Sequence, residues 1–285
     1  MTKFDENYIL HQQGDVKWLT FPQLDQYPEL AHLFTTRCGG VSTGEKTSWN
    51  FGKGPDETWD NILENYRILG EIIGCDRSRM VRTDQTHTAN VLAVTEEHLG
   101  MGILREREYT NIDGLVTNLK GVTLITSHGD CNALFFYDPV KQVIGQAHSG
   151  WKGTLKEIGA EVIRVMKDEY GSKPENLLVG IGPALCQDCF EVDEDVAQMF
   201  YEKNPEWRKL SYVIDTSVCS ETGETRRKHY IDLKGIMRDT LTGNGVKSEN
   251  IFDMQLCSKC RPDLFYSYRR QKGMNGNMVS AMMLK

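Results

Sequence analysis

The stretches Ser127-His128-Gly129-Asp130-Cys131 and Ala147-His148-Ser149-Gly150-Trp151-Lys152-Gly153 frame the most informative part of the sequence. Between them lie two apolar runs, 133–137 and 143–147, separated by the turn signal Asp138-Pro139. This pattern predicts two strands joined as a hairpin. A hairpin would bring Cys131, before the first strand, to the same end as His148, after the second. A thiolate and an imidazole at one end of a sheet can bind a metal or form a nucleophile–base pair.

The rest of the chain combines many short apolar runs with a few amphipathic segments. Apolar residues recur at helical spacing over 57–73 and from Leu155 to Tyr170, and glycine ends each segment. Shorter helices are expected over 192–201 and 233–241. Further strands are expected near residues 8–10, 18–21, 32–37, 89–94, 113–117, 121–126, 177–181, 229–232, 251–254, 264–268 and 278–284. Because strands follow one another in runs, the sequence favours an α+β fold with a mixed sheet. No repeat or linker interrupts it, so we expect one domain over residues 1–285, with residues 1–30 at its periphery.

Composition excludes several classes of protein. A chain of 285 residues with 39% hydrophobic and 26% charged residues suits a globular protein with a sizeable core. The net charge is −7 and no basic stripe is present, which argues against a nucleic-acid partner. No run reaches transmembrane length and no signal peptide is recognisable. Eight cysteines without a signal favour reduced thiols. We therefore expect a cytoplasmic protein with no membrane partner. Its oligomeric state, monomer or homodimer, stays open.

The histidines limit where a metal could bind. His87 and His148 lie at strand ends beside glycine or small polar residues, where site groups are common. With Cys131 they would supply two imidazoles and one thiolate, and leave one tetrahedral position open, as in catalytic zinc sites. On the residues alone, a buried free cysteine with two hydrogen-bonded histidines remains the alternative. Three other histidines are expected at the surface or at helix caps: His11, His32 and His98.

Two Cys-x-x-Cys pairs form a second candidate. Cys186 and Cys189 precede Cys257 and Cys260 by a gap much longer than that of an ordinary zinc ribbon. Together they could hold a structural zinc ion, but isolated reduced cysteines are the alternative.

Several motifs, taken in order, resemble the laccase-domain family, also called the polyphenol oxidase family. The resemblance runs from about residue 32 to the C-terminus. It implies layered mixed β-sheets flanked by helices, a fold shared with bacterial cysteine deamidases. The zinc ligands of the family fall on His87, Cys131 and His148. The matching motifs are 34–42, Asn50-Phe51-Gly52, Gln85-Thr86-His87, 113–117, Asp130-Cys131, 148–154, Gly182-Pro183, 190–192 and 265–270.

The resemblance implies a purine nucleoside phosphorylase with added adenosine deaminase activity. Phosphate would attack the anomeric carbon of adenosine, inosine, guanosine or methylthioadenosine and release the purine. Arg37, the glycine turn after it and the helix start after Gly153 could form an anion pocket. Asn50 and Gln85 could hydrogen-bond the sugar or base. In deamination the metal would activate water for attack on C6 of adenine, with Asp130 carrying protons.

The sequence departs from the family at two places. His128-Gly129 stands where a small residue usually precedes Asp-Cys, and Asn277 follows Gly276 where an arginine is frequent. If that arginine helps to hold substrate, affinity for phosphate or base could differ in this chain.

Two other functions stay open. A copper-dependent polyphenol oxidase would need paired His-x-His elements for a trinuclear copper centre, and none occurs. A metal-free cysteine hydrolase or amidase, acting on peptidoglycan precursors, would use Cys131 as nucleophile and His148 as base. Metal analysis separates the zinc enzyme from the cysteine hydrolase, because a metal on Cys131 would block its use as a nucleophile.

Overall fold

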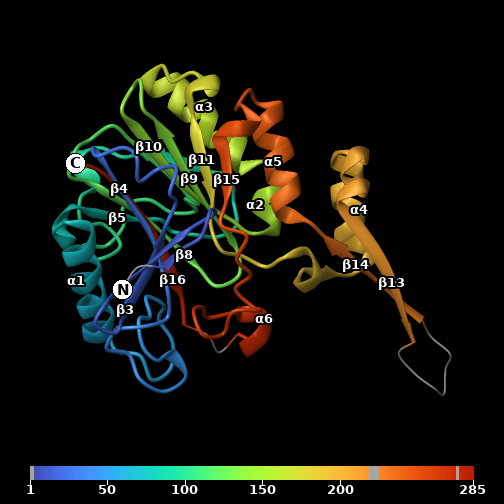
Figure 1. Cartoon of the computed structure of the whole chain (residues 1–285), viewed down its shortest axis with the longest axis horizontal. Coiled ribbons are helices and arrows are strands. Elements are labelled where there is room, and N and C mark those ends of the chain that lie inside the picture. The colour runs from blue at the N-terminus through green and yellow to red at the C-terminus, as the bar shows by residue number, and fades with distance from the viewer. Residues whose placement is uncertain (1–2, 218–224, 274–275) are drawn as a thin grey trace.

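The computed structural model describes residues 3–217, 225–273 and 276–285 (Figure 1). Two mixed sheets form the body of the molecule, and a third, smaller sheet projects from it (Figure 1). The first sheet has the order β1 (Lys3–Phe4), β2 (Ile9–Gln13), β3 (Val16–Thr20), β4 (Leu30–Thr35), β16 (Met278–Leu284), β8 (Thr123–His128) and β5 (Met80–Arg82). The second has the order β15 (Ile251–Asp253), β11 (Leu178–Ile181), β9 (Asn132–Asp138), β10 (Val143–Ser149), β7 (Gly114–Thr117) and β6 (Val91–Ala93).

The body has four layers. Helix α1 (Trp59–Ile73) packs Ile62, Tyr66 and Leu69 on the outer face of the first sheet. The two sheets face each other across the largest core, where Phe34 of β4 and Phe135 of β9 are both fully buried. Helices α3 (Ile158–Tyr170) and α5 (Leu233–Gly243) cover the outer face of the second sheet. The expected α+β fold of layered mixed sheets flanked by helices is therefore confirmed.

The first thirty residues supply β1–β3 to the edge of the first sheet. Leu19, Phe21 and Leu24 from this segment are fully buried in the core between the sheets. The segment thus extends a sheet at its edge and also contributes to the packing between the two layers.

The predicted hairpin is present. Strands β9 and β10 pair antiparallel, with Ser149 opposite Asn132 and His148 opposite Ala133. Both strands are buried along their whole length, which explains their continuous apolar sequence. Cys131 and His148 consequently lie at the same end of the second sheet.

The long helix expected over 155–170 is broken. Helix α2 (Trp151–Leu155) and α3 are separated by Glu157, whose φ of 58° is left-handed. Leu155 packs toward the projecting unit, whereas Ile158 packs on the second sheet. The break lets neighbouring apolar residues reach two different cores.

The expected strand over 264–268 is wrong. Leu264, Phe265 and Tyr266 are buried, but their backbone forms turns that lead into the short helix α6 (Tyr268–Gln271). The backbone carbonyl of Leu264 accepts a 2.7 Å hydrogen bond from the N–H of Arg37, so burial here follows from loop packing.

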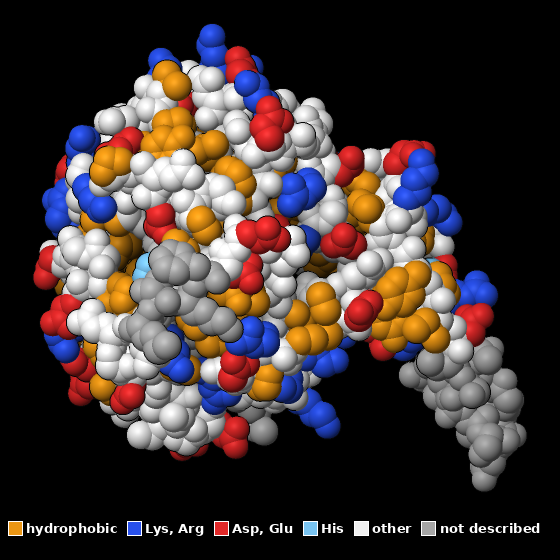
Figure 2. All heavy atoms as spheres, in the orientation of Figure 1, with side chains coloured by type: hydrophobic (Ala, Val, Ile, Leu, Met, Phe, Trp, Pro, Cys, Tyr) orange, Lys and Arg blue, Asp and Glu red, His pale blue; other side chains and the backbone are white. Residues whose placement is uncertain are grey.

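A projecting unit leaves the body at Cys189. It consists of β12 (Glu191–Val192), β13 (Ser211–Ser217), β14 (Thr225–Ile231) and helix α4 (Glu194–Lys203), and Figure 1 shows it standing off to one side. A small core that includes Phe200, Trp207 and Ile231 joins this unit to α5 and α2 of the body. On the face shown in Figure 2, basic and acidic side chains are interspersed over both the body and this unit. Among the described residues, none of the helices has the length and hydropathy needed to cross a membrane.

Candidate functional site

Three side chains from separate elements meet at one end of the second sheet. His148 is on β10, Cys131 immediately precedes β9, and His87 is in the turn between β5 and β6. One ligand atom from each lies within 4.8 Å of the others. The fold thus brings together the three residues that the sequence suggested as metal ligands.

Asp113 organises this cluster, although in the sequence it stands out only as part of a strand motif. Its fully buried carboxylate accepts hydrogen bonds from the backbone N–H groups of Thr86, His87 and Thr88 at 3.1, 3.2 and 2.8 Å. These bonds support His87 in a left-handed conformation with φ of 62°. The same carboxylate accepts a 2.8 Å bond from Nδ1 of His148. A polar residue just before a buried strand was the one signal that could have found it.

The electrostatics of the cluster favour a cation. Burial alone would lower the pKa of His148, but Cys131 and the Asp113 carboxylate raise it to about 9. Burial would raise the pKa of Asp113, but hydrogen bonds from His148 and Thr88 lower it to about 2. Burial and the neighbouring His148 lower the pKa of His87. The site therefore stabilises positive charge beside Cys131 and keeps His87 in the neutral form that binds metals.

The three residues fit a metal ion. The bond to Asp113 occupies Nδ1 of His148, while its other ring nitrogen faces Cys131, which is the usual arrangement of a carboxylate-oriented metal ligand. Gly150 provides the necessary space, because a Cβ there would lie 2.5 Å from His87 Nδ1 and 3.0 Å from Cys131 Sγ. Two imidazoles and a thiolate are ligands of zinc, and three of them leave a position open.

A cavity of about 800 Å³ opens over this cluster. Its size matches sites that bind a small molecule. Trp59, Trp151 and Tyr268 contribute aromatic surface, which suits a planar ring. Four basic and two acidic side chains also line it: Lys53, Arg82, Arg107, Arg269, Asp84 and Asp130.

Two of the arginines lie against each other. Arg107 Nε donates a 3.1 Å hydrogen bond to the carbonyl of Arg82, and Arg82 donates from one terminal nitrogen to Ser127 Oγ at 2.8 Å. Burial and then the charge of Arg82 lower the pKa of Arg107. An anion beside both guanidinium groups would relieve this repulsion. Neither residue stands out in the sequence, because single arginines at a strand end or in a loop have no distinctive spacing.

Gln85 and Asp130 line the cavity as expected, but both are already hydrogen-bonded. Gln85 Oε1 accepts from the Ser127 N–H at 2.7 Å, and its Nε2 donates to the Ser127 carbonyl at 2.7 Å. Asp130 accepts 2.6 Å bonds from Ser258 Oγ and from the Arg269 N–H. Burial raises the pKa of Asp130, which suits a group that exchanges protons.

Arg37 and Asn50 are not among the residues that line this cavity. The guanidinium of Arg37 donates to the carbonyls of Thr47 and Pro262 and lies 4.8 Å from the ring centre of Tyr266. Asn50 is fully buried, and its Oδ1 accepts from the N–H groups of Gly52 and Asn277 at 2.9 and 2.8 Å. Asn50 thus shapes the loop that brings Gly52 to the cavity. The helix start expected after Gly153 occurs instead at Trp151.

The two departures from the family differ in position. His128 is buried beneath the cluster, with Nδ1 at 3.2 Å from the Cys131 carbonyl and Nε2 at 2.7 Å from Thr126 Oγ1. Asn277 lines the cavity. Of the histidines expected at the surface, His32 is instead 5% exposed, and its Nε2 accepts from the Phe21 N–H at 2.8 Å.

Comparison with known proteins identifies the family. A sequence model described as multi-copper polyphenol oxidoreductase laccase matches residues 31–285. The chain belongs to this family. It is 36% identical over 257 residues to the purine nucleoside phosphorylase YlmD of Bacillus subtilis, covering 88% of this chain and 87% of that protein. It is 34% identical over 255 residues to a purine nucleoside phosphorylase of Deinococcus radiodurans, with 88% of each chain covered.

Solved structures of the family have the same architecture. The hypothetical protein YfiH of Bacillus licheniformis superposes with a TM-score of 0.85 at 28% identity and covers 97% of this chain and 99% of its own. YlmD of Geobacillus stearothermophilus superposes with a TM-score of 0.82 at 27% identity, covering 97% and 98%.

Proposed function

We propose that this chain is a zinc-dependent purine nucleoside phosphorylase with adenosine deaminase activity. The observation that carries the proposal is one cavity that joins a His87–Cys131–His148 cluster to a pair of arginines and to aromatic surface. The names of two relatives, both purine nucleoside phosphorylases, support the same assignment. The substrates would be adenosine, inosine, guanosine or methylthioadenosine, together with phosphate.

In phosphorolysis a phosphate oxygen forms a bond to C1′ of the pentose, and the bond from C1′ to N9 of the purine breaks. Its electron pair leaves with the base, which takes up a proton, and the other product is the pentose 1-phosphate. Arg82 and Arg107 would bind the phosphate, since guanidinium groups pair with phosphate oxygens in a defined geometry. Arg37, expected to do this, is held by Thr47 and Pro262 outside the cavity.

In deamination water adds to C6 of adenine and ammonia leaves, which requires proton transfers in both steps. Asp130 would carry these protons, because burial raises the pKa of its carboxyl and it lies next to Cys131. Zinc held by His87, Cys131 and His148 would supply a positive charge that polarises an oxygen or lowers the pKa of water.

The test is purified protein incubated with adenosine, with and without phosphate, followed by chromatography. We expect adenine and ribose 1-phosphate only when phosphate is present, and inosine in either case. Absence of all three products from protein that carries stoichiometric zinc would refute the proposal. Oxygen uptake with a phenol after copper loading would instead support the polyphenol oxidase.

One observation also favours the cysteine hydrolase. Cys131 and His148 are neighbours, and Cys131 contributes to the raised pKa of His148, as expected where an imidazole is the base for a cysteine nucleophile. Such an enzyme would hydrolyse an amide without metal and would be inhibited by zinc. Activity that survives complete removal of zinc and disappears on alkylation of Cys131 would select this function.

A further inference from the structure

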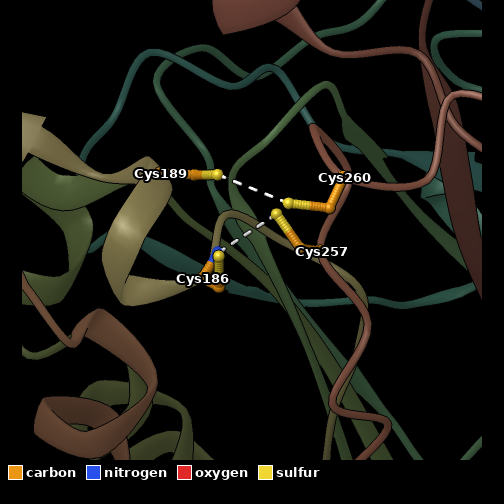
Figure 3. A group of neighbouring side chains, drawn as sticks. All are labelled: Cys186, Cys189, Cys257 and Cys260. Atoms are coloured by element: carbon orange, nitrogen blue, oxygen red, sulfur yellow. Dashed lines mark hydrogen bonds between the residues drawn. The ribbon is translucent and has the colours of Figure 1, made fainter.

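The two Cys-x-x-Cys pairs come together outside the residues that line the cavity, next to Ser258, which hydrogen-bonds Asp130. Figure 3 shows the side chains of Cys186, Cys189, Cys257 and Cys260 directed toward one another. We call these four residues the cysteine cluster. One sulfur from each lies within 4.8 Å of the others, and the sulfurs of Cys189 and Cys260 are 3.5 Å apart. The long sequence gap between the pairs is closed by the fold.

We propose that the cysteine cluster binds a structural zinc ion. Four cysteine sulfurs form a closed tetrahedral site, the usual set for zinc that stabilises a fold. A zinc–sulfur distance of about 2.3 Å places sulfurs of such a site about 3.8 Å apart. The observed spacing suits one ion, because the ligand sulfurs around a multi-iron cluster would have to be farther apart.

The backbone around the cluster is arranged for thiolates. The N–H of Cys186 donates a 3.4 Å hydrogen bond to the sulfur of Cys257. Each pair forms a tight turn: the N–H of Cys189 donates to the carbonyl of Cys186 at 3.0 Å, and the N–H of Arg261 donates to the carbonyl of Cys257 at 3.1 Å. Cys189 and Cys257 are each only 8% exposed. Zinc binding would release the thiol protons, and the positive ion would offset the mutual repulsion of the four thiolates.

The two turns belong to segments that the ion would join. Cys186 and Cys189 lie between β11 and the projecting unit, while Cys257 and Cys260 follow β15. The segments already share two backbone hydrogen bonds, from the Ala184 N–H to Leu256 and from the Ser258 N–H to Ala184, at 3.2 and 3.0 Å. A zinc ion bound by all four cysteines would cross-link these two segments.

The second turn also touches the wall of the cavity. Ser258, between Cys257 and Cys260, donates to the Asp130 carboxylate at 2.6 Å. Arg270 of α6 donates to the carbonyls of Ser258 and Lys259 at 3.0 and 2.8 Å. Loss of the ion should therefore weaken the contacts that position Asp130, but it would not remove any of the candidate ligands His87, Cys131 and His148.

The experiment is metal analysis of full-length protein purified under reducing conditions, loaded with excess zinc and desalted. We expect two zinc ions per chain in the wild type and one in Cys260→Ser. Cys131→Ala should also retain one, at the cysteine cluster. Cys75→Ser is the matched control, because Cys75 is half-buried but outside both clusters, and it should keep two. Cys260→Ser should also unfold at a lower temperature than Cys75→Ser.

The proposal is overturned if Cys260→Ser holds as much zinc as the wild type. It is also overturned if the wild type holds only one zinc ion per chain and Cys131→Ala holds none. Iron in place of zinc would also overturn it. Disulfides in the reduced preparation, seen by intact mass as loss of four hydrogens, would exclude the site as well. If Cys260→Ser does not fold, the test is instead made by loading Cys131→Ala with cobalt and recording its absorption spectrum. The spectrum of a tetrahedral four-thiolate site is then expected, and its absence refutes the proposal. None of these outcomes depends on nucleoside turnover, so the proposed enzyme function can fail independently.

Discussion

Asp113 Oδ1 accepts a 2.8 Å hydrogen bond from His148 Nδ1, and the same carboxylate accepts from the backbone beside His87. One buried carboxylate thus positions two of the three candidate metal ligands. Thr88 also donates to it with both its N–H and its hydroxyl, each at 2.8 Å. The relative orientation of the two imidazoles depends on this residue.

Asp113→Asn should weaken metal binding by roughly 10- to 100-fold, as loss of such orienting carboxylates does elsewhere. Asparagine keeps one acceptor oxygen but loses the charge that stabilises His148. Competition with a chromogenic chelator measures the affinity. Asp168→Asn, an exposed carboxylate paired with Arg164 on α3, is the control and should bind as the wild type does. Equal affinities in all three proteins would contradict the role assigned to Asp113.

Gly150→Ala should abolish metal binding and turnover. The new Cβ would meet His87 Nδ1 at 2.5 Å and Cys131 Sγ at 3.0 Å, so the ligands must separate. Gly243→Ala is a matched control on α5, where a Cβ meets nothing within 4 Å. Zinc content and the thermal midpoint are measured for both. A Gly150→Ala protein with full zinc occupancy would show that the ligands do not need this space.

Arg82→Gln should raise the KM for phosphate by about 10- to 100-fold, because a hydrogen bond to a charged group contributes about 1.5–3 kcal/mol. The KM for the nucleoside should change much less. Initial rates at varied phosphate give both constants. Arg164→Gln, at an exposed ion pair on α3, serves as control. If both KM values rise equally, Arg82 acts on the cavity as a whole and the assignment to phosphate fails.

Stability should fall in mild acid partly because of His32. Burial, then the charges of His11 and Lys285, lower the pKa of His32 to about 3, below its ordinary value of about 6.5. The unfolded chain therefore takes up the proton first. Neutral His32 therefore contributes fully to the free energy of unfolding above about pH 6.5. As the pH falls toward 3, this contribution decreases by at most about 1.4 kcal/mol per pH unit.

His32→Gln should flatten this part of the profile. Glutamine can accept the hydrogen bond from the Phe21 N–H without titrating. Urea unfolding at several pH values between about 4 and 7 gives the free energy of unfolding of each protein. Parallel profiles for the variant and the wild type would show that another group causes the acid sensitivity.

The sequence predicted local structure best where a single face was buried. Helix α1 begins after the N-cap Thr58 and ends at Gly74, as its periodicity and glycine indicate. The β9–β10 hairpin was predicted on a different basis, from two continuous apolar runs with a turn signal between them, and it placed Cys131 beside His148. Prediction was wrong at 264–268, because burial in a packed loop leaves the same apolar pattern as a strand.

The sequence could identify only those site residues whose type and position at a strand end are informative by themselves. His87, Cys131 and His148 have chemistry that selects them from the sequence. Asp113 and Arg82 act through contacts with segments distant in the chain, and no local pattern reveals these. Arg37 and Asn50 have suitable side chains, but tertiary contacts direct them to Thr47 and Gly52.

Arg269 connects two parts of the molecule. Its N–H donates to Asp130 in the wall of the cavity, while its guanidinium donates to the carbonyl of Glu191 at the base of the projecting unit, at 3.1 Å. A macromolecule that shifted the projecting unit would therefore act on a residue that lines the cavity. The two binding events would then be linked. The factor by which the macromolecule changes the affinity for a ligand in the cavity would equal the factor by which that ligand changes the affinity for the macromolecule.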